Sequence, residues 1–168
     1  MAQTIVTQEG AFDLGAKTAI NNNFSQLFSE RLDLTPRTAS VTLTSEDSGV
    51  VNALNVATGM TVTLPAATGS GNTYMFAVKT TVTSNSYIIK VARSIDIFGG
   101  TATMGSAGGT SASVGTAADS DTITMNGTTT AGRAGTWIEI RDIASGLFNV
   151  AMHGVASGVA STPFSATV

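Results

Sequence analysis

The stretch from Val41 to Ala92 constrains the fold most, because bulky or β-branched residues alternate there with small polar residues in four short runs. Alternation with a period of two places successive side chains on opposite faces of a β-strand. In one run, Val62 and Leu64 are expected on one face, with Thr61 and Thr63 on the other. The runs are divided by the turn-forming sequences Asp-Ser-Gly, Ala-Thr-Gly, Gly-Ser-Gly and Ser-Asn-Ser. These features predict a β-meander.

The next run along, Tyr74–Lys79, is apolar at nearly every position. Such a run is typical of a strand that is covered on both faces, so something must pack on the sheet. No helical pattern separates the strands, which excludes a nucleotide-binding α/β unit. We therefore expect an all-β fold, an antiparallel β-sandwich of jelly-roll or tulip-like topology, with an N-terminal extended arm and one short amphipathic helix. The spacing of the strands leaves their order open.

The first 32 residues carry two different apolar patterns. Residues 16–32 repeat with a helical period, and their apolar stripe consists of Ile20, Phe24, Leu27 and Phe28. This stripe is expected to pack against the chain's own sheet or against the same helix of a trimer mate. Residues 1–15 hold two apolar pairs, Ile5 with Val6 and Phe12 with Leu14. They predict either a terminus lying on its own domain or an arm that docks on a neighbouring subunit.

A gradient of charge predicts the division of the chain. Of the 19 charged residues, nine lie at or before Asp47, and the other ten are spread thinly over the much longer remainder of the chain. We expect an arm and helix over residues 1–37, a β-sandwich over 38–153 and a flexible tail over 154–168. The small, glycine-rich residues 99–121 are expected to form a long surface loop, functional or disordered.

Further strands are expected within the predicted sandwich, one over residues 94–98 and three over residues 122–125, 137–143 and 147–152. In the strand over residues 137–143, Trp137, Glu139 and Arg141 share one face, while Ile138 and Ile140 share the other.

The composition narrows the function classes. Only 11% of the residues are charged, against about 25% in typical proteins. Charge is depleted at the centres of protein interfaces, which favours a subunit of an assembly. The net charge is −3 with scattered Lys and Arg, so no nucleic-acid partner is expected. No apolar run is long enough to span a bilayer and no signal peptide is recognisable, so we expect no membrane partner and synthesis in a cytoplasm.

Residues that could carry chemistry are few. His153 is the single histidine and no Gly-x-Ser-x-Gly elbow accompanies it, so an ordinary surface or interface histidine is expected. Asp119 and Asp121 lack the rest of a calcium loop. Cysteine is absent. We expect no enzyme, no catalytic residue, no metal and no cofactor, and we assign Trp137, Tyr74 and Tyr87 mostly to packing rather than to glycan binding.

Several motifs together resemble the capsid decoration, or cement, proteins of tailed bacteriophages. They are Thr-Leu-Thr-Ser-Glu-Asp-Ser-Gly from Thr42, Thr-Leu-Pro from Thr63, Asp-Thr-Ile-Thr from Asp121, Gly-Thr-Trp from Gly135 and Gly-Leu-Phe-Asn-Val from Gly146. The resemblance covers about residues 40–155. It departs at Phe148, where the family would have Trp. The segment Ala-Ile-Asn-Asn-Asn-Phe-Ser-Gln-Leu-Phe from Ala19 separately resembles a short helix of phage tail-fibre and other virion proteins.

This resemblance implies a structural virion protein on the outer surface of a phage head. Its expected partners are the major capsid protein and itself, as a homotrimer, and the arm residues Ile5, Val6, Phe12 and Leu14 would touch the capsid. One alternative is a tail-fibre or head-fibre module that binds a host glycan. The weakest alternative is a glycan depolymerase, which would need paired carboxylates from among Asp96, Asp119, Asp121, Glu139 and Asp142.

Overall fold

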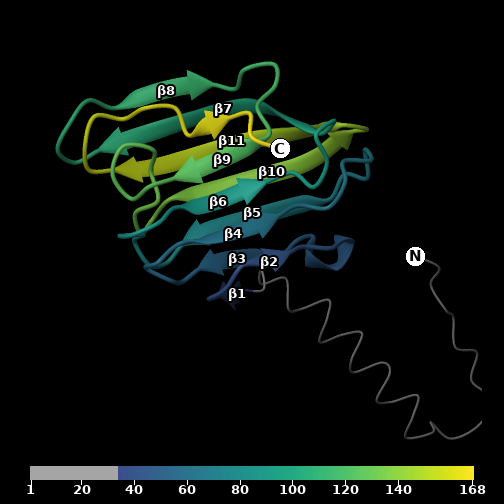
Figure 1. The fold of residues 1–168 in the computed structure, drawn as a ribbon, viewed down its shortest axis with the longest axis horizontal. Coiled ribbons are helices and arrows are strands. Elements are labelled where there is room, and N and C mark those ends of the chain that lie inside the picture. The colour runs from purple at the N-terminus through teal and green to yellow at the C-terminus, as the bar shows by residue number, and fades with distance from the viewer. Residues whose placement is uncertain (1–33) are drawn as a thin grey trace, which may run out of the picture. The chain divides into compact units, whose positions relative to one another are not determined.

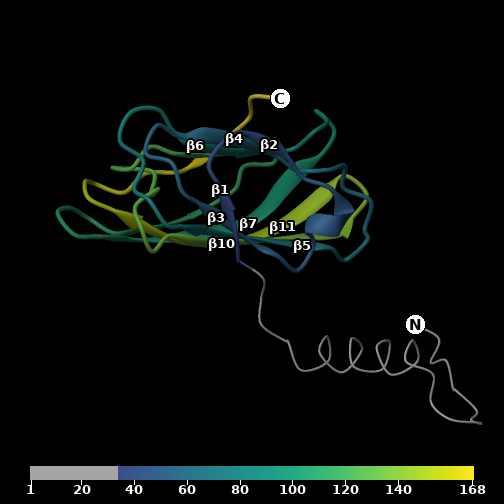
Figure 2. The ribbon, with the colours of Figure 1, turned by 90° about the horizontal axis from the view of Figure 1, so that it is seen from below.

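A computed structural model describes residues 34–168, which form two packed β-sheets with no α-helix among them. Figure 2 shows the two sheets edge-on as separate layers. The all-β prediction is confirmed, and the two sheets are consistent with a β-sandwich. A 3₁₀ turn, Ser45–Asp47, lies between β2 and β3.

The larger sheet has seven strands, in the order β1-β3-β5-β10-β11-β7-β8 (Figure 1). Their bounds, in that order, are Leu34–Arg37, Val51–Leu54, Thr73–Val78, Trp137–Ala144, Leu147–Ala156, Ile97–Ser106 and Ala112–Gly115. The smaller sheet has five strands, in the order β12-β9-β6-β4-β2. Their bounds are Phe164–Ser165, Thr122–Met125, Tyr87–Lys90, Met60–Thr63 and Val41–Thr42.

The first six strands alternate between the two sheets, so the predicted β-meander is wrong. Strands β1, β3 and β5 lie side by side in parallel in one sheet, and β2, β4 and β6 do so in the other. The turns between the runs therefore carry the chain across to the opposite sheet instead of closing hairpins. Alternation shows which face of a strand is buried, but it does not show which strand lies next to it.

The prediction of an antiparallel sandwich is wrong for the same reason. β11 also pairs with β7 in parallel, whereas β10 pairs antiparallel with both β5 and β11, and the remaining antiparallel pairs are β6–β9, β7–β8 and β9–β12. The sheets are thus mixed. A jelly roll is built from antiparallel Greek keys, and these parallel pairs depart from that topology.

The core lies between the sheets and follows the predicted alternation. Met60, Val62 and Leu64 are buried, while Thr61 and Thr63 are half-buried on the other face of β4. In the facing sheet the rings of Phe98 and Phe148 lie 6.2 Å apart. Strand β5 is covered on both faces, as predicted, although less tightly on its outer face. Its inward residues Tyr74, Phe76 and Val78 are buried, Met75 is 8% exposed on the outer face, and Ala77 is half-buried.

Residues 99–121 are not the surface loop that their composition predicts. β7 spans Ile97–Ser106 and β8 spans Ala112–Gly115, and Ala102 and Met104 of β7 are fully buried. The small residues belong to a close strand pair: a side chain at Gly100 would overlap the backbone of Val150 on β11. Glycine marks close backbone approach here rather than flexibility.

The structure also differs from the prediction at both ends of the β-domain. β1 begins at Leu34, earlier than the expected boundary at residue 38. At the other end, β11 continues to Ala156 and β12 pairs with β9. Residues 154–168, expected to be a flexible tail, thus contribute a strand to the smaller sheet. Burial of Phe164, which is 7% exposed, accounts for this.

Candidate functional site

The outer face of the seven-stranded sheet carries aromatic, charged and polar side chains that are accessible to solvent. As predicted, Trp137, Glu139 and Arg141 share one face of β10, and Ile138 and Ile140 are buried on the other. The register places His153, Ala151 and Asn149 of β11 directly beside the first three. We call these six residues the β10–β11 face.

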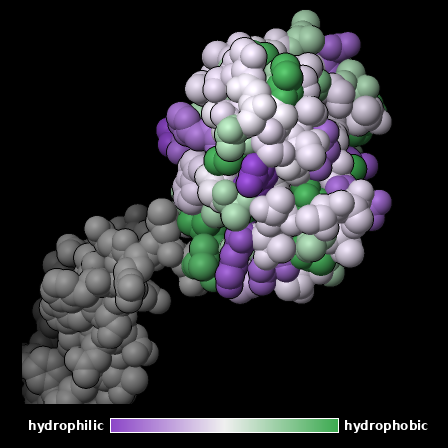
Figure 3. Space-filling model, turned by 90° about the vertical axis from the view of Figure 1, so that its left-hand side faces the viewer, coloured by the Kyte–Doolittle hydropathy of each residue, from purple (hydrophilic) through white to green (hydrophobic). Residues whose placement is uncertain are grey.

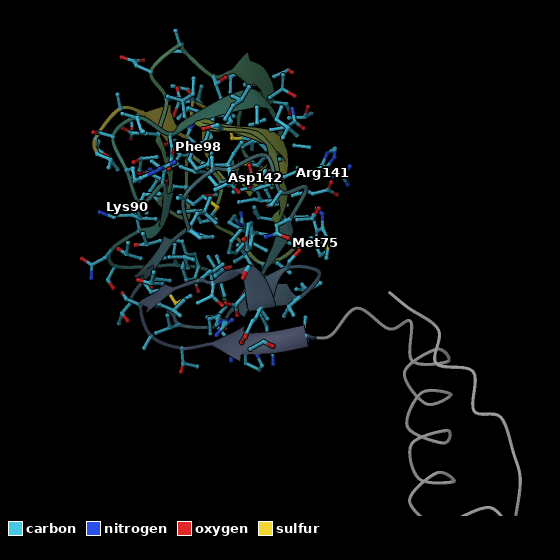
Figure 4. All side chains as sticks on the ribbon, turned by 90° about the vertical axis from the view of Figure 1, so that its right-hand side faces the viewer. Met75, Lys90, Phe98, Arg141 and Asp142 are labelled. Carbon is cyan, nitrogen blue, oxygen red and sulfur yellow. The ribbon has the colours of Figure 1, made fainter. Side chains whose placement is uncertain are left out.

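An ion pair lies within the β10–β11 face. Arg141 Nη2 is 3.2 Å from Glu139 Oε1, and Arg141 Nε donates to Thr73 Oγ1 at 3.2 Å. Figure 4 shows Arg141 and Met75 on the same side of the domain, with Lys90 of the smaller sheet on the opposite side. The two charged side chains are about half exposed, so water screens the pair and it adds little stability.

On the same face, the strands that follow β10 in the sheet, β11, β7 and β8, carry no charged side chain. No charged side chain occurs in residues 97–118 or 143–168, which include strands β7, β8 and β11. On strands β7, β8 and β11 the exposed side chains are small and neutral, namely Thr101, Thr103, Ser113, Asn149 and Ala151, together with His153. Figure 3 shows another side of the β-domain, where near-neutral residues predominate and hydrophobic and hydrophilic ones are scattered. A large part of the seven-stranded sheet therefore presents a charge-poor surface.

The two tyrosines are unavailable to a ligand. Tyr74 and Tyr87 are fully buried, and burial raises the pKa of both. The Tyr87 hydroxyl lies 2.7 Å from the Val56 carbonyl oxygen and 2.9 Å from that of Thr80. The assignment of these tyrosines to packing is confirmed, while Trp137 is half-buried on the β10–β11 face.

Asp142 is a buried carboxylate that organises a loop. Its Oδ1 accepts the N–H of Gly69 at 2.7 Å, and its Oδ2 accepts the N–H and the hydroxyl of Ser70 at 3.0 and 2.7 Å. The N–H and hydroxyl of Thr68 donate to it as well. Burial alone raises the pKa, but the Ser70 hydroxyl and the three N–H groups outweigh it and lower the pKa to about 2. Asp142 stabilises the fold in its charged form.

Two other buried aspartates have comparable structural roles. Asp96 accepts from Arg93 Nη2 at 2.6 Å and from the N–H of Ala67 at 3.3 Å, next to the loop that Asp142 holds. Asp121 accepts the N–H groups of Thr167 and Val168 at 2.7 and 2.9 Å. Burial raises the pKa of Asp121, but these N–H groups and the Thr122 hydroxyl outweigh it, so the pKa is lowered overall. Both carboxylates therefore stabilise the fold through these hydrogen bonds.

Sequence reasoning missed the role of Asp142, although a signal was present. The alternation that buries Ile138 and Ile140 places residue 142 on the same inward face. A carboxylate at a core position must find hydrogen-bond donors, because an uncompensated buried charge costs too much. Its donors come from a loop more than seventy residues earlier, and the sequence did not show that they are neighbours.

Within residues 34–168, no three His, Asp or Glu side chains are grouped closely enough to hold a metal ion. His153 is exposed on the β10–β11 face and makes no hydrogen bond to a described carboxylate. Asp119 is exposed, whereas Asp121 is turned toward the backbone of residues 167 and 168.

The residues predicted for the arm and the helix lie outside the described part of the chain. They are Ile5, Val6, Phe12 and Leu14 in the arm and Ile20, Phe24, Leu27 and Phe28 in the helix.

Comparison with protein-family models, curated proteins and solved structures finds no match for this chain. Within the described part of the chain, no helix has the length and hydropathy needed to cross a bilayer.

Proposed function

We propose that the chain is a structural virion protein of the capsid decoration type. It would bind the outer surface of a phage head and stabilise the shell by bridging major capsid proteins. The observation that carries the proposal is the charge-poor outer face of β11, β7 and β8. Such a surface can be desolvated against another protein at low cost, because it holds no charge that would lose its hydration.

A decoration protein needs no chemistry of its own. A ligand that binds the assembled shell but not its separated parts stabilises the shell by mass action. Rigidity favours this role, because less conformational freedom is lost on binding. Among the described residues, every buried side-chain nitrogen and oxygen has a hydrogen-bond partner. The two sheets are also joined by a continuous hydrophobic core.

The finer architecture belongs to the same proposal. We infer a tulip-like subunit in a homotrimer, in which the N-terminal arm reaches the capsid through Ile5, Val6, Phe12 and Leu14. The stripe Ile20, Phe24, Leu27 and Phe28 would pack the amphipathic helix against the β-domain or a trimer mate. The complete assembly would be located on the outside of the virion.

Binding to heads that lack the chain tests the proposal. The wild-type protein is expected to cosediment with such heads and to raise the temperature at which they release DNA. Thr101→Lys places a charge on the exposed, charge-poor face of β7 and should weaken cosedimentation. Thr61→Lys places the same charge on the outer face of β4 in the other sheet and serves as the matched control. Equal binding by both variants would place the contact elsewhere, and no binding by the wild type would refute the proposal.

One observation favours a second candidate, a fibre module that binds a host glycan. Trp137 is half-buried between Ala77 and His153, and a flat aromatic surface beside hydrogen-bonding groups suits a sugar ring. A glycan array probed with the wild type and with Trp137→Ala separates the candidates. Sugar binding that the substitution abolishes would favour the fibre module.

A further inference from the structure

The four sheet edges of the described β-domain differ in how they are protected. β2 and β12, the edges of the smaller sheet, are only two residues long, and β1 carries Pro36, which has no N–H to offer. Short strands and proline are common means of preventing edge pairing. β8 is four residues long and contains neither proline nor charge. Figure 1 shows β8 at the margin of its sheet, with no other strand of residues 34–168 beyond it.

The hydrogen-bond pattern identifies the free groups of β8. The N–H of Thr116 donates to the Gly100 carbonyl of β7 at 3.0 Å, and backbone groups along a strand alternate in direction. Ala112 and Val114 therefore direct their N–H and C=O groups toward β7, and Ser113 and Gly115 direct theirs away from it. Both are exposed, and no turn or loop hydrogen bond within residues 34–168 involves their backbone.

We propose that β8 pairs antiparallel with β8 of a second copy of this chain. Unpaired backbone donors and acceptors in an extended strand are recognised by another extended strand. The second copy fits because this edge is self-complementary: a two-fold axis brings Ser113 of one copy opposite Ser113 or Gly115 of the other. Residues 97–118 carry no charge, so two identical edges meet without repulsion. Their small side chains allow the close approach of two strands.

The pairing would join two seven-stranded sheets into one continuous sheet. It is isologous, since the same surface is used by both subunits, and it closes at two copies. It is thus a different contact from the three-fold contact of the proposed trimer. The β8 pairing does not involve a capsid. If the pairing is absent, the proposed function is unaffected, and if the proposed function is refuted, the pairing is unaffected.

Sedimentation equilibrium of the full chain over a range of concentrations tests the pairing. The wild type is expected to show a concentration-dependent step that doubles the mass of its smallest species, which is one chain or, where the proposed trimer forms in solution, three chains. Ser113→Pro removes only the outward N–H, and Ser113→Lys brings like charges together across the two-fold axis. Each should weaken the doubling by about tenfold or more, since edge prolines and lysines block strand addition. Unchanged thermal unfolding verifies that both variants fold.

Two controls restrict the effect to the edge. Ser113→Ala keeps the outward N–H, and Thr101→Lys places the charge on the face of β7 beside Gly115 rather than on the edge. Both are expected to associate like the wild type. The proposal is overturned if the wild type shows no doubling step, if Ser113→Pro and Ser113→Lys associate normally, or if Thr101→Lys is as defective as they are.

Discussion

Asp142 Oδ1 accepts the backbone N–H of Gly69 at 2.7 Å, across a separation of 73 positions in the sequence. The contact joins a strand from the second half of the chain to a loop from the first half. Since the same carboxylate also holds Thr68 and Ser70, the loop conformation depends on one charged group. Two predictions about stability follow from this arrangement.

The first concerns the substitution Asp142→Asn, which keeps the shape of the side chain but removes its charge and half of its acceptor capacity. The amide nitrogen would meet N–H donors that can no longer be satisfied. We expect the free energy of unfolding to fall by about 3 kcal/mol. Urea denaturation measures the change. Asp119→Asn is the matched control at an exposed site and should change stability little; equal losses for the two variants would contradict the account.

The second concerns acid. The pKa of Asp142 is lowered from 3.8 to about 2, so its contribution is fully present above pH 4 and disappears as the pH falls through 2. The contribution is about 2 kcal/mol. The pKa of Asp121 is lowered as well, and its effect has the same sign. Denaturation midpoints between pH 7 and 2 should show a loss of stability that is shallower in Asp142→Asn than in the wild type. Identical profiles would show that Asp142 is not the group that titrates.

A third prediction uses two glycines of β7. A Cβ at Gly100 would overlap the backbone of Val150, whereas a Cβ at Gly105 would meet nothing within 4 Å. Gly100→Ala is therefore expected to lower the free energy of unfolding by about 3 kcal/mol. Gly105→Ala should leave it unchanged or raise it slightly. Thermal unfolding of the two variants compares them directly, and similar melting temperatures would refute the tight β7–β11 pairing.

A fourth prediction concerns the C-terminal strand. Phe164 is 7% exposed and belongs to the hydrophobic core, whereas Val159 is 64% exposed. Phe164→Ala should lower the free energy of unfolding by about 3 kcal/mol or more. Val159→Ala should change it by less than about 0.5 kcal/mol. If Phe164→Ala were equally harmless, residues 154–168 would be the loose tail that their composition predicts.

The sequence alone predicted single strands better than their partners. The alternation of Thr61, Val62, Thr63 and Leu64, and that of residues 137–141, was confirmed. The parallel pairing of Val41 with Val62 could not be predicted, because alternation shows which face of a strand is buried and not which strand lies beside it. Only the first two residues of β7, Ile97 and Phe98, fall within an expected strand, because the glycines and alanines that follow resemble a loop in composition. These residues are small because β11 approaches them closely, and that contact is seen only in the folded structure.

In the candidate site, too, the sequence predicted features within one strand and missed contacts between strands. That Trp137, Glu139 and Arg141 share a face is a local property, and it was predicted correctly. That His153 lies beside Trp137 depends on the register of β10 and β11, and that the charge-poor face extends to β8 depends on the sheet order. Neither is written in residue spacing. The N-terminal residues on which the arm and helix predictions depend lie outside the described part of the chain.

The central claim is that this chain decorates a capsid, and its copy number per particle tests that claim most directly. Quantitative mass spectrometry of purified virions would compare it with the major capsid protein in the same sample. We predict amounts comparable to those of the major capsid protein. A small fraction of that amount, as a fibre would give, or absence from the particle would contradict the account.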